Sequence, residues 1–174
     1  MVVLADGARG APGLPVALAA LALLAAALVG PGCAEPPVPS PEQQAVFAQD
    51  VDAEVVVVAA RNAMRYETPV VEAPAGATVR LVMDNAETTS PAMVHNVVVV
   101  RTEAAVERVG RAARGDELPD DPALVAATPL AGPGERTAVV FTMPPPGRYP
   151  FVCTYPGHWA FMQGTLVSTP PASE

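Results

Sequence analysis

Four side chains of this sequence carry donor atoms that soft metal ions prefer. The chain has only two histidines, His95 and His158, and Cys153 and Met162 lie close to the second of them. Cys153, His158 and Met162 follow one another in the pattern C-x4-H-x3-M. One thiolate, two imidazoles and a weak axial thioether form the ligand set that suits copper in electron transfer. These residue types therefore predict a site for one copper ion.

The local sequence indicates how these ligands come together. Residues 149–153 are expected to form a strand that ends at Cys153, and Pro156-Gly157 is a turn signal. Such a turn folds the chain back, so that His158 and Met162 point at the same place as Cys153. His95 must then come from a neighbouring strand. With three ligands on one loop and one on a packed strand, the surrounding fold fixes the site.

Short apolar or alternating segments dominate the chain from about residue 50 onward. They cover residues 55–59, 66–72, 77–83, 95–101, 137–142, 149–153 and 164–168. Within 77–83, Val79, Leu81 and Met83 fall on one face of a strand. Such short strands, separated by Gly, Pro and Asn, predict an all-β fold, a sandwich with Greek-key connections.

One segment departs from this pattern. Residues 103–114 are typical of an amphipathic helix in which Ala105, Val109 and Ala112 share one face and Arg and Glu occupy the other. Residues 118–134 are rich in Pro and Asp and are expected to form a loop. A helix-bearing flap over about residues 102–134 is therefore predicted to interrupt the strands.

The N-terminus has the features of an export signal. Residues 16–29 are an unbroken apolar run, shorter than the roughly 20 residues that a membrane-spanning helix needs, and they fit the apolar core of a secretory signal. Small residues directly before Cys33 resemble the bacterial lipoprotein processing site, although Gly30 stands where that site usually has Leu. Residues 1–32 are therefore predicted to be a signal segment, after which Cys33 is either lipidated or incidental to a plain cleavage site.

Residues 33–49 are predicted to be a tether. The stretch 34–41 contains too much proline to fold and is typical of a stiff polyproline II spacer, with a reach of roughly 25 Å. Together with a lipidated Cys33, it would hold a folded domain of residues 50–174 close to a membrane. The sequence thus predicts an exported protein, in the periplasm or on the outer cell surface, anchored to the membrane as a lipoprotein.

Charge and cysteine content narrow the function classes further. The net charge is −8, and all ten basic residues are arginines scattered along the chain. Because there is no basic stripe, nucleic acid is disfavoured as a partner, and partners with positive patches are favoured. Cys33 and Cys153 lie in very different surroundings and are not expected to pair. The protein is expected to be a monomer.

The ligand motifs resemble those of the cupredoxins, the blue-copper proteins, and among these azurin and auracyanin most. Met93-Val94-His95-Asn96 is similar to the first-ligand motif of that family, and Cys153-Thr-Tyr-Pro-Gly-His158 through Met162-x-Gly164 is similar to its ligand loop. The resemblance covers about residues 50–168 and includes the position of the flap. It implies a one-electron carrier, not an enzyme, that exchanges electrons with redox proteins such as a cytochrome.

The same resemblance implies the roles of individual residues. The equatorial copper ligands would be His95, Cys153 and His158, and the axial ligand would be Met162. The Val94 carbonyl would match a weak fifth contact, whereas Asn96 and Thr154 would hydrogen-bond near the thiolate and brace the two ligand segments. Two features depart from azurin, because its disulfide has no counterpart here and Val94 stands where it has glycine.

Other interpretations of these residues stay open at this point. Cys153, a histidine and Asn96 could form a thiol enzyme of the Cys-His-Asn type, although Met162 would then have no role. Copper storage or delivery is another hypothesis, although delivery sites are usually exposed and rich in Met or Cys. Zinc rarely takes a Met ligand. Three apolar residues are either simple packing or an apolar rim on which a redox partner would dock: Met64, Met93 and Trp159.

Overall fold

The computed structural model describes residues 52–171. The predicted signal segment, residues 1–32, and the predicted tether, residues 33–49, lie outside the described residues, so both stay predictions. No helix within residues 52–171 combines the length and the apolar content that crossing a membrane requires.

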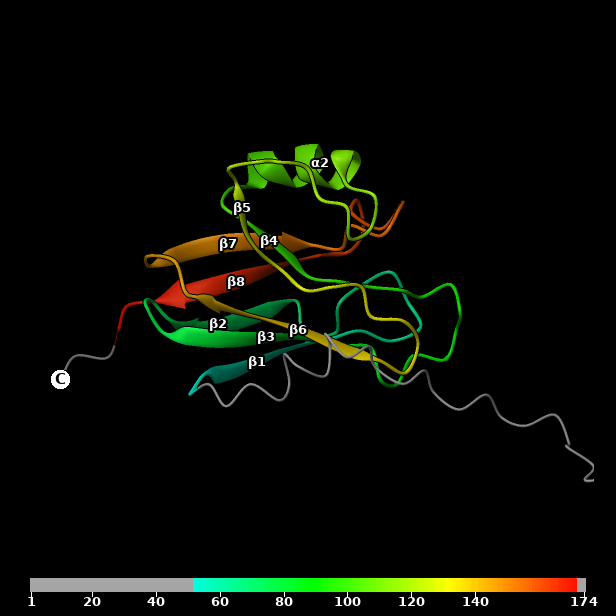
Figure 1. Cartoon of the computed structure of the whole chain (residues 1–174), viewed down its shortest axis with the longest axis horizontal. Coiled ribbons are helices and arrows are strands. Elements are labelled where there is room, and N and C mark those ends of the chain that lie inside the picture. The colour runs from blue at the N-terminus through cyan, green and yellow to red at the C-terminus, as the bar shows by residue number, and fades with distance from the viewer. Residues whose placement is uncertain (1–51, 172–174) are drawn as a thin grey trace, which may run out of the picture. The chain divides into compact units, whose positions relative to one another are not determined.

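The strands within these residues form two sheets (Figure 1). The smaller sheet has the order β1 (Glu54–Ala59), β3 (Thr78–Asp84) and β6 (Arg136–Thr142). The larger sheet has the order β2 (Val70–Pro74), β8 (Gln163–Thr169), β7 (Gly147–Val152), β4 (Val98–Val100) and β5 (Leu124–Ala127). Helix α2 (Glu103–Ala112) lies on the outer face of the larger sheet. The predicted all-β sandwich with a helical flap is confirmed.

The chain passes repeatedly from one sheet to the other, as Greek-key connections require. β1 pairs with β3 and β2 pairs with β8 in parallel, whereas the other pairs are antiparallel. In the antiparallel pair of β4 and β7, Val98 lies opposite Val152. His95 comes just before β4 and Cys153 just after β7, so this pairing brings the two residues to the same end of the sheet.

The main core lies between the two sheets. The predicted face of β3 is confirmed, because Val79, Leu81 and Met83 are all fully buried. Phe151 of β7 and Leu166 of β8 belong to the same cluster from the opposite sheet. Each fully buried side chain of this kind contributes roughly 1.5–3 kcal/mol. These rows of side chains therefore hold the two sheets in register around the site.

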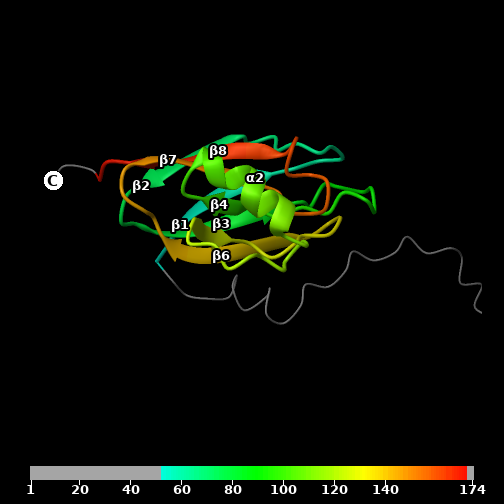
Figure 2. The ribbon, with the colours of Figure 1, turned by 90° about the horizontal axis from the view of Figure 1, so that it is seen from above.

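The valine run at β4 is buried on both sides of the larger sheet. Val97 and Val99 belong to the core between the sheets, whereas Val98 and Val100 pack under α2, which Figure 2 shows lying over this sheet. Successive side chains of a strand point to opposite faces. A strand covered on both faces therefore needs apolar residues at every position, and the flap supplies the second cover.

Two features of the flap differ from the prediction. Residues 118–134, expected to be loop throughout, contain strand β5, which pairs with β4. Ala112 is exposed and ends the helix, and the buried helical residues are Ala105, Val106, Val109 and Gly110. The predicted face was therefore partly wrong. The buried stripe is rotated toward Gly110, because Trp159 packs there.

Two predicted strands are also shorter than expected. β2 begins at Val70, and Tyr66 makes only an isolated bridge with Ala60. Pro69 has no backbone N–H to donate to a ladder, which explains the late start. His95 likewise makes an isolated bridge before β4 begins.

Candidate metal centre

Residues 153–162, the ligand loop, contain one tight turn. The His158 N–H donates to the Tyr155 carbonyl at 3.0 Å, which closes a turn over residues 155–158. Pro156 in the second position and Gly157 in the third, with φ at 88°, match a type II turn. The third residue of this turn needs the left-handed conformation that glycine tolerates. The predicted Pro156-Gly157 turn is thereby confirmed.

A single helical turn then closes the ligand loop at its base. The Met162 N–H donates to the His158 carbonyl at 2.9 Å, and the Cys153 N–H donates to the Met162 carbonyl at 3.1 Å. The first and last residues of the loop are therefore neighbours. The Met162 side chain is fully buried in the same core cluster as Cys153.

His95 lies outside the ligand loop, in the segment before β4, where buried backbone contacts hold it. Its N–H donates to the Ala131 carbonyl at 3.1 Å, and its carbonyl accepts from the Ala131 N–H at 2.7 Å. The buried Asn85 donates through Nδ2 to the carbonyls of Met93 at 2.9 Å and of Ala131 and Gly132 at 3.0 Å. This one amide thus fastens both strands of the bridge that carries His95.

The imidazole and thiol donors converge. Cys153 Sγ lies 4.0 Å from Nδ1 of His95 and 3.7 Å from Nδ1 of His158. Donor atoms of these three buried residues all lie within 4.8 Å of one another. The set contains nitrogen and sulfur but no carboxylate oxygen, so it fits copper better than Mg²⁺ or Ca²⁺. With Met162 in the same cluster, the four predicted residues are arranged as a type 1 copper site.

Burial keeps both imidazoles neutral. Desolvation, assisted by the neighbouring His158, lowers the pKa of His95 to about 4. A contact with the Arg61 backbone acts in the opposite direction and raises the pKa. This contact is weak, because Nε2 of His95 makes no well-formed hydrogen bond to any described residue. Desolvation also lowers the pKa of His158. Near pH 7 both rings therefore keep a lone pair available for a metal ion.

The Cys153 thiol is a weak acid in the metal-free protein. Burial raises its pKa to about 11, and hydrogen bonds with the backbones of Asn96 and Tyr155 oppose this only in part. A reactive, nucleophilic cysteine needs the opposite environment. Because a bound cation is required to ionise this thiol near pH 7, the site favours a metal ligand over a catalytic nucleophile.

Asn96 and Thr154 connect the two ligand segments directly. Asn96 Nδ2 donates to Thr154 Oγ1 at 2.8 Å, and the Thr154 N–H donates to Asn96 Oδ1 at 2.8 Å. Asn96 follows His95, and Thr154 follows Cys153. This buried pair therefore ties one ligand-bearing segment to the other. Val94 is half-buried, and its carbonyl contact with the metal stays a prediction.

Tyr66 is a neighbour of the site that sequence reasoning missed. Its hydroxyl donates to the Asn96 carbonyl at 2.5 Å, and its ring meets Phe151 edge-on with the centroids 5.0 Å apart. Burial and the nearby Cys153 raise the pKa of Tyr66 well above its usual value, so it stays a neutral donor. The only signal was an aromatic residue in an expected strand, because its partner lies 30 residues away.

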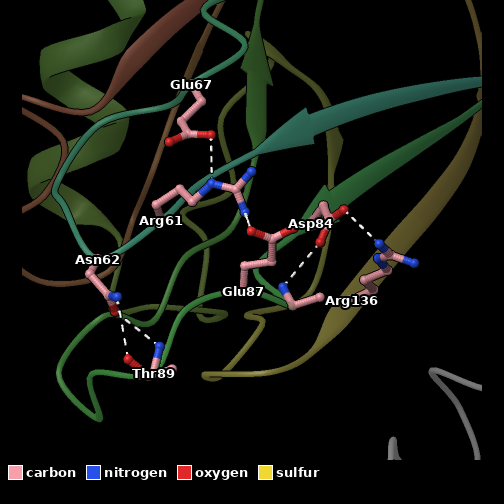
Figure 3. Close-up of polar contacts among 8 residues, drawn as sticks. Arg61, Asn62, Glu67, Asp84, Glu87, Thr89 and Arg136 are labelled. Carbon is pink, nitrogen blue, oxygen red and sulfur yellow. Dashed lines mark hydrogen bonds and ion pairs between the residues drawn. The ribbon is translucent and has the colours of Figure 1, made fainter.

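A polar network on the surface ties the loop after β1 to the loop after β3 (Figure 3). Arg61 pairs with Glu67 at 2.8 Å and also with Glu87. Asn62 Oδ1 accepts the Thr89 N–H at 2.9 Å. The second loop leads toward the first histidine, so the network supports that side of the site from outside. Exposed ion pairs contribute about 1 kcal/mol or less each, which makes this support modest.

Four apolar side chains are candidates for a docking surface, of which Trp159 and Phe161 lie in the ligand loop and Met64 and Met93 lie in the loops after β1 and β3. Phe161 is 72% exposed and Met64 is 44% exposed, whereas Met93 is half-buried. Trp159 is half-buried and packs with the cluster under α2, so packing accounts for part of its surface. Phe161 was absent from the predicted rim, because its residue type alone does not distinguish an exposed position from a core position.

These observations define the class of protein. A model of copper-binding proteins of the plastocyanin/azurin family matches residues 53–168. Both ligand segments and the flap between them fall within this range. The chain therefore belongs to the plastocyanin/azurin family of copper-binding proteins, and the resemblance of its ligand motifs to the cupredoxins is confirmed.

Individual relatives agree with this class. Auracyanin-B of Chloroflexus aurantiacus is 36% identical over 124 residues, which are 67% of this chain and 52% of that protein. Outer membrane protein H.8 of Neisseria meningitidis is 38% identical over 82 residues, 42% of this chain and 44% of that protein. The structure of dithionite-reduced auracyanin from the photosynthetic bacterium Roseiflexus castenholzii matches with a TM-score of 0.60 and 31% identity, over 68% of this chain and 98% of that chain. The chain spans about half the length of these two curated relatives.

Proposed function

We propose that this protein is a one-electron carrier with a single type 1 copper site, and that it exchanges electrons with other redox proteins without transforming a substrate. The observation that carries the proposal is the convergence of Cys153 Sγ with Nδ1 of His95 and His158, at 4.0 and 3.7 Å, in the buried core beside Met162. Membership of a copper-binding family supports the choice of ion.

The ligand roles follow from this placement, with His95, Cys153 and His158 equatorial and Met162 axial. When bound, copper supplies a reversible change between Cu(I) and Cu(II). Imidazole suits the oxidised ion, and sulfur ligands suit the reduced ion. The closed ligand loop and the bridged His95 segment hold the donors in one arrangement. Little of the protein therefore has to move when an electron arrives or leaves.

Three neighbouring residues are proposed to tune the site. Asn96 and Thr154 brace the two ligand segments through their paired bonds of 2.8 Å. The Asn96 backbone also hydrogen-bonds Cys153, and stabilising charge on a thiolate raises the reduction potential of the metal. The Val94 carbonyl is proposed as a weak fifth contact.

His158 is the proposed exit for the electron. Its side chain is 5% exposed, whereas His95 has no exposed surface. Exposed neighbours lie around it in the ligand loop: Pro156, Gly157, Ala160 and Phe161. Apolar groups that are easily desolvated suit brief contact with a partner such as a cytochrome. We propose that Met64 and Phe161 belong to this contact surface and that the protein acts as a monomer.

Two other functions fit the site less well. A thiol enzyme needs an accessible cysteine of low pKa, but Cys153 is fully buried and its pKa is raised to about 11. The Asn96 amide is bonded to Thr154 at both ends, which leaves it unsuited to orient a catalytic histidine. Copper delivery favours an exposed site, whereas the donor residues here are buried.

The optical spectrum of the copper-loaded protein tests the proposed function. A Cys153 thiolate bound to Cu(II) gives an intense blue charge-transfer band, which one reducing equivalent should bleach reversibly. Cys153→Ser should lose the colour and keep the circular dichroism of the wild-type protein. A colourless wild-type protein that holds one Cu(II) ion would contradict the proposal.

Met162→Leu tests the axial role. Because the thioether bond is weak, the variant should stay blue and have a higher reduction potential. Met143→Leu is the control, because Met143 is a buried methionine that follows β6 at the end of the sandwich far from the site. The reduction potential of this variant should equal that of the wild-type protein. Complete loss of copper binding by Met162→Leu would contradict the axial assignment.

We also propose that the chain is exported and anchored, with residues 1–32 as the signal, Cys33 as the lipidated residue and residues 33–49 as the tether. The name of the relative outer membrane protein H.8 supports a membrane location for a chain with this kind of domain. Wild-type protein expressed in a bacterial host should incorporate labelled palmitate and sediment with membranes. Cys33→Ala should do neither, and identical fractionation of the two would contradict the anchor.

A further inference from the structure

Helix α2 meets the ligand loop at a position that only glycine leaves open. A Cβ atom at Gly110 would lie 2.6 Å from both Cβ and Cγ of Trp159, far inside normal carbon contact distances. The indole therefore rests directly on the backbone of the helix. Trp159 immediately follows His158 in the ligand loop, so this contact is one residue away from a proposed metal ligand.

Two further contacts hold Trp159 in this position. The Arg111 guanidinium lies over the indole, 5.1 Å from the ring centroid, a distance typical of a cation–π interaction. Arg111 is itself held by Glu107 at 2.7 Å. Gln163 Nε2 donates to the Trp159 carbonyl at 2.9 Å. Both the ring and the backbone of Trp159 are therefore held.

The flap is tied to the ligand loop a second time, at Thr154. Thr154 Oγ1 donates to the Gly115 carbonyl at 2.8 Å, and the Gly115 N–H donates to the Thr154 carbonyl at 3.2 Å. Thr154 is adjacent to Cys153, just as Trp159 is adjacent to His158. The flap thus contacts the loop next to two of the proposed ligands.

We propose that helix α2 is an outer brace of the copper site, and that Gly110 is the positioning residue through which the helix sets the place of His158. The inference rests on the proposed function and adds to it a residue that touches neither the metal nor a ligand. Because Gly110 has no side chain, the indole of Trp159 can pack directly on the helix, and this contact fixes the position of the Trp159 backbone. That backbone in turn fixes the direction from which His158 reaches the metal.

Gly110→Ala tests this role, because the local and tertiary effects of the change have opposite signs. Alanine is the better helix former in a helix interior, so the isolated helix would gain from the substitution. We therefore expect any disturbance to come from contact with Trp159, whose side chain supplies the three nearest atoms. A solvent-open hollow of about 280 Å³ beside the indole, lined in part by Arg114 and Pro156, offers the displaced ring a place to move.

The first measurement uses metal-free protein. Trp159 is the only tryptophan of the chain, so its fluorescence reports on this contact. In Gly110→Ala the emission should shift to the red, and iodide should quench it more strongly. Gly147→Ala is the matched control, because the three atoms nearest to a Cβ there belong to the Tyr149 side chain and lie at ordinary distances of 3.5–3.7 Å. Its emission should equal that of the wild type.

The second measurement is a double-mutant cycle on copper-loaded protein. Trp159→Gly removes the side-chain atoms that the new methyl group would meet. Gly110→Ala should change the hyperfine splitting in the Cu(II) electron paramagnetic resonance spectrum, and the reduction potential, when Trp159 is present. It should change neither in the Trp159→Gly background. Wild-type circular dichroism of all four proteins excludes unfolding as the cause.

A change that disappears in the Trp159→Gly background supports the brace. The inference would be overturned if Gly110→Ala had the same emission, resonance spectrum and reduction potential as the wild-type protein. The proposed function would stay intact in that case, provided that the copper-loaded wild-type protein is blue. Equal changes in both backgrounds would also overturn the inference, because the substitution would then act through the helix and not through Trp159. If copper-loaded wild-type protein is colourless, the proposed function is contradicted. The inference about helix α2 then fails with it, because there is no copper site for the helix to support.

Discussion

The two ligand-bearing segments are held by different kinds of interaction. His95 has no exposed surface, and buried backbone bonds and the Asn85 amide fasten its segment. The ligand loop is held by its own closing bonds and by packing against α2. Four of its ten residues face solvent: Pro156, Gly157, Ala160 and Phe161. One side of the site thus belongs to the core, and the other is a surface loop seated on a helix.

Because of this difference, the His95 segment contributes mainly to the stability of the fold, and the ligand loop provides the surface that a partner can reach. Substitutions on the His95 side leave buried polar groups without partners, and such groups are costly. Substitutions among the exposed atoms of the ligand loop cost little folding energy, although those atoms are the ones that a partner can reach. An electron carrier needs both a rigid holder and an accessible edge. The comparison therefore predicts large stability effects on one side and functional effects without stability effects on the other.

Asn85→Ala should have the largest effect. The substitution removes the amide that serves three backbone carbonyls, and an unsatisfied buried group costs about 1–3 kcal/mol. Because the Ala131 carbonyl keeps its bond from His95, we expect the free energy of unfolding to fall by about 3 kcal/mol in total. Urea unfolding of the metal-free protein measures this loss.

Asn62→Ala is the matched control for that experiment. Asn62 also makes three side-chain hydrogen bonds, to Thr89 and Ser90, but all are exposed. Water can replace exposed bonds, so the loss should stay below about 1 kcal/mol. If both variants lost the same free energy, burial would not be what distinguishes the two networks, and the comparison would be wrong.

The next effect is a pH dependence of the metal-free protein. Burial, and secondly His158, lower the pKa of His95 from 6.5 to about 4. The unfolded chain therefore binds this proton more readily than the folded protein does. The contribution of His95 to stability is fully present above pH 6.5 and is lost as the pH falls through 4. We expect a loss on the order of 2 kcal/mol.

Urea unfolding at pH 7 and pH 4 measures this dependence, and His95→Gln serves as the control. The variant should lose less free energy between the two pH values than the wild-type protein loses. Asp84, whose pKa is lowered through its contacts with Arg136 and Ala86 against the effect of burial, titrates mainly below this window. An unchanged pH dependence in His95→Gln would place the titrating group elsewhere in the protein.

Three of the four ligands and the turn between them were predictable from sequence, because Cys153, His158 and Met162 are related by local spacing. A chain with two histidines offers few ways to complete a soft donor set, and Pro156-Gly157 encodes its turn within four residues. The alternation in β3 was visible for the same reason. Strand β5 escaped notice because its four residues are all half-buried, so they show no alternation, and because prolines surround them.

The contacts that support the site could not be predicted in this way. Asn85 and the Ala131 carbonyl are 46 residues apart, and no local pattern relates them. The buried face of α2 was partly mispredicted because the residues that cover it, among them Val98, Val100 and Trp159, lie outside the helix. The sequence around Gly110 likewise gives no sign of the indole that packs on it, 49 residues further along the chain. Interactions of this kind depend on the packing of sheets and become visible only with the fold.

A smaller effect is expected at the surface of the His95 side. Arg61→Gln removes two ion pairs, with Glu67 and Glu87, whose side chains are exposed. We expect the free energy of unfolding to fall by about 1 kcal/mol at low salt. The difference from wild type should shrink in high salt, because ions screen exposed pairs. A salt-independent loss would mean that Arg61 acts through its packing instead.

Phe161→Ser should change the free energy of unfolding least. It tests the ligand loop, the exposed one of the two ligand-bearing segments. The Phe161 side chain is 72% exposed, so the free energy of unfolding should change by less than about 0.5 kcal/mol. The second-order rate of electron exchange with a cytochrome, measured by stopped flow, should fall several-fold, because an apolar contact is lost. Val55→Ser is the control, since Val55 is 56% exposed but lies in β1. If Val55→Ser slowed the exchange as much, the ligand loop would not be the edge that partners use.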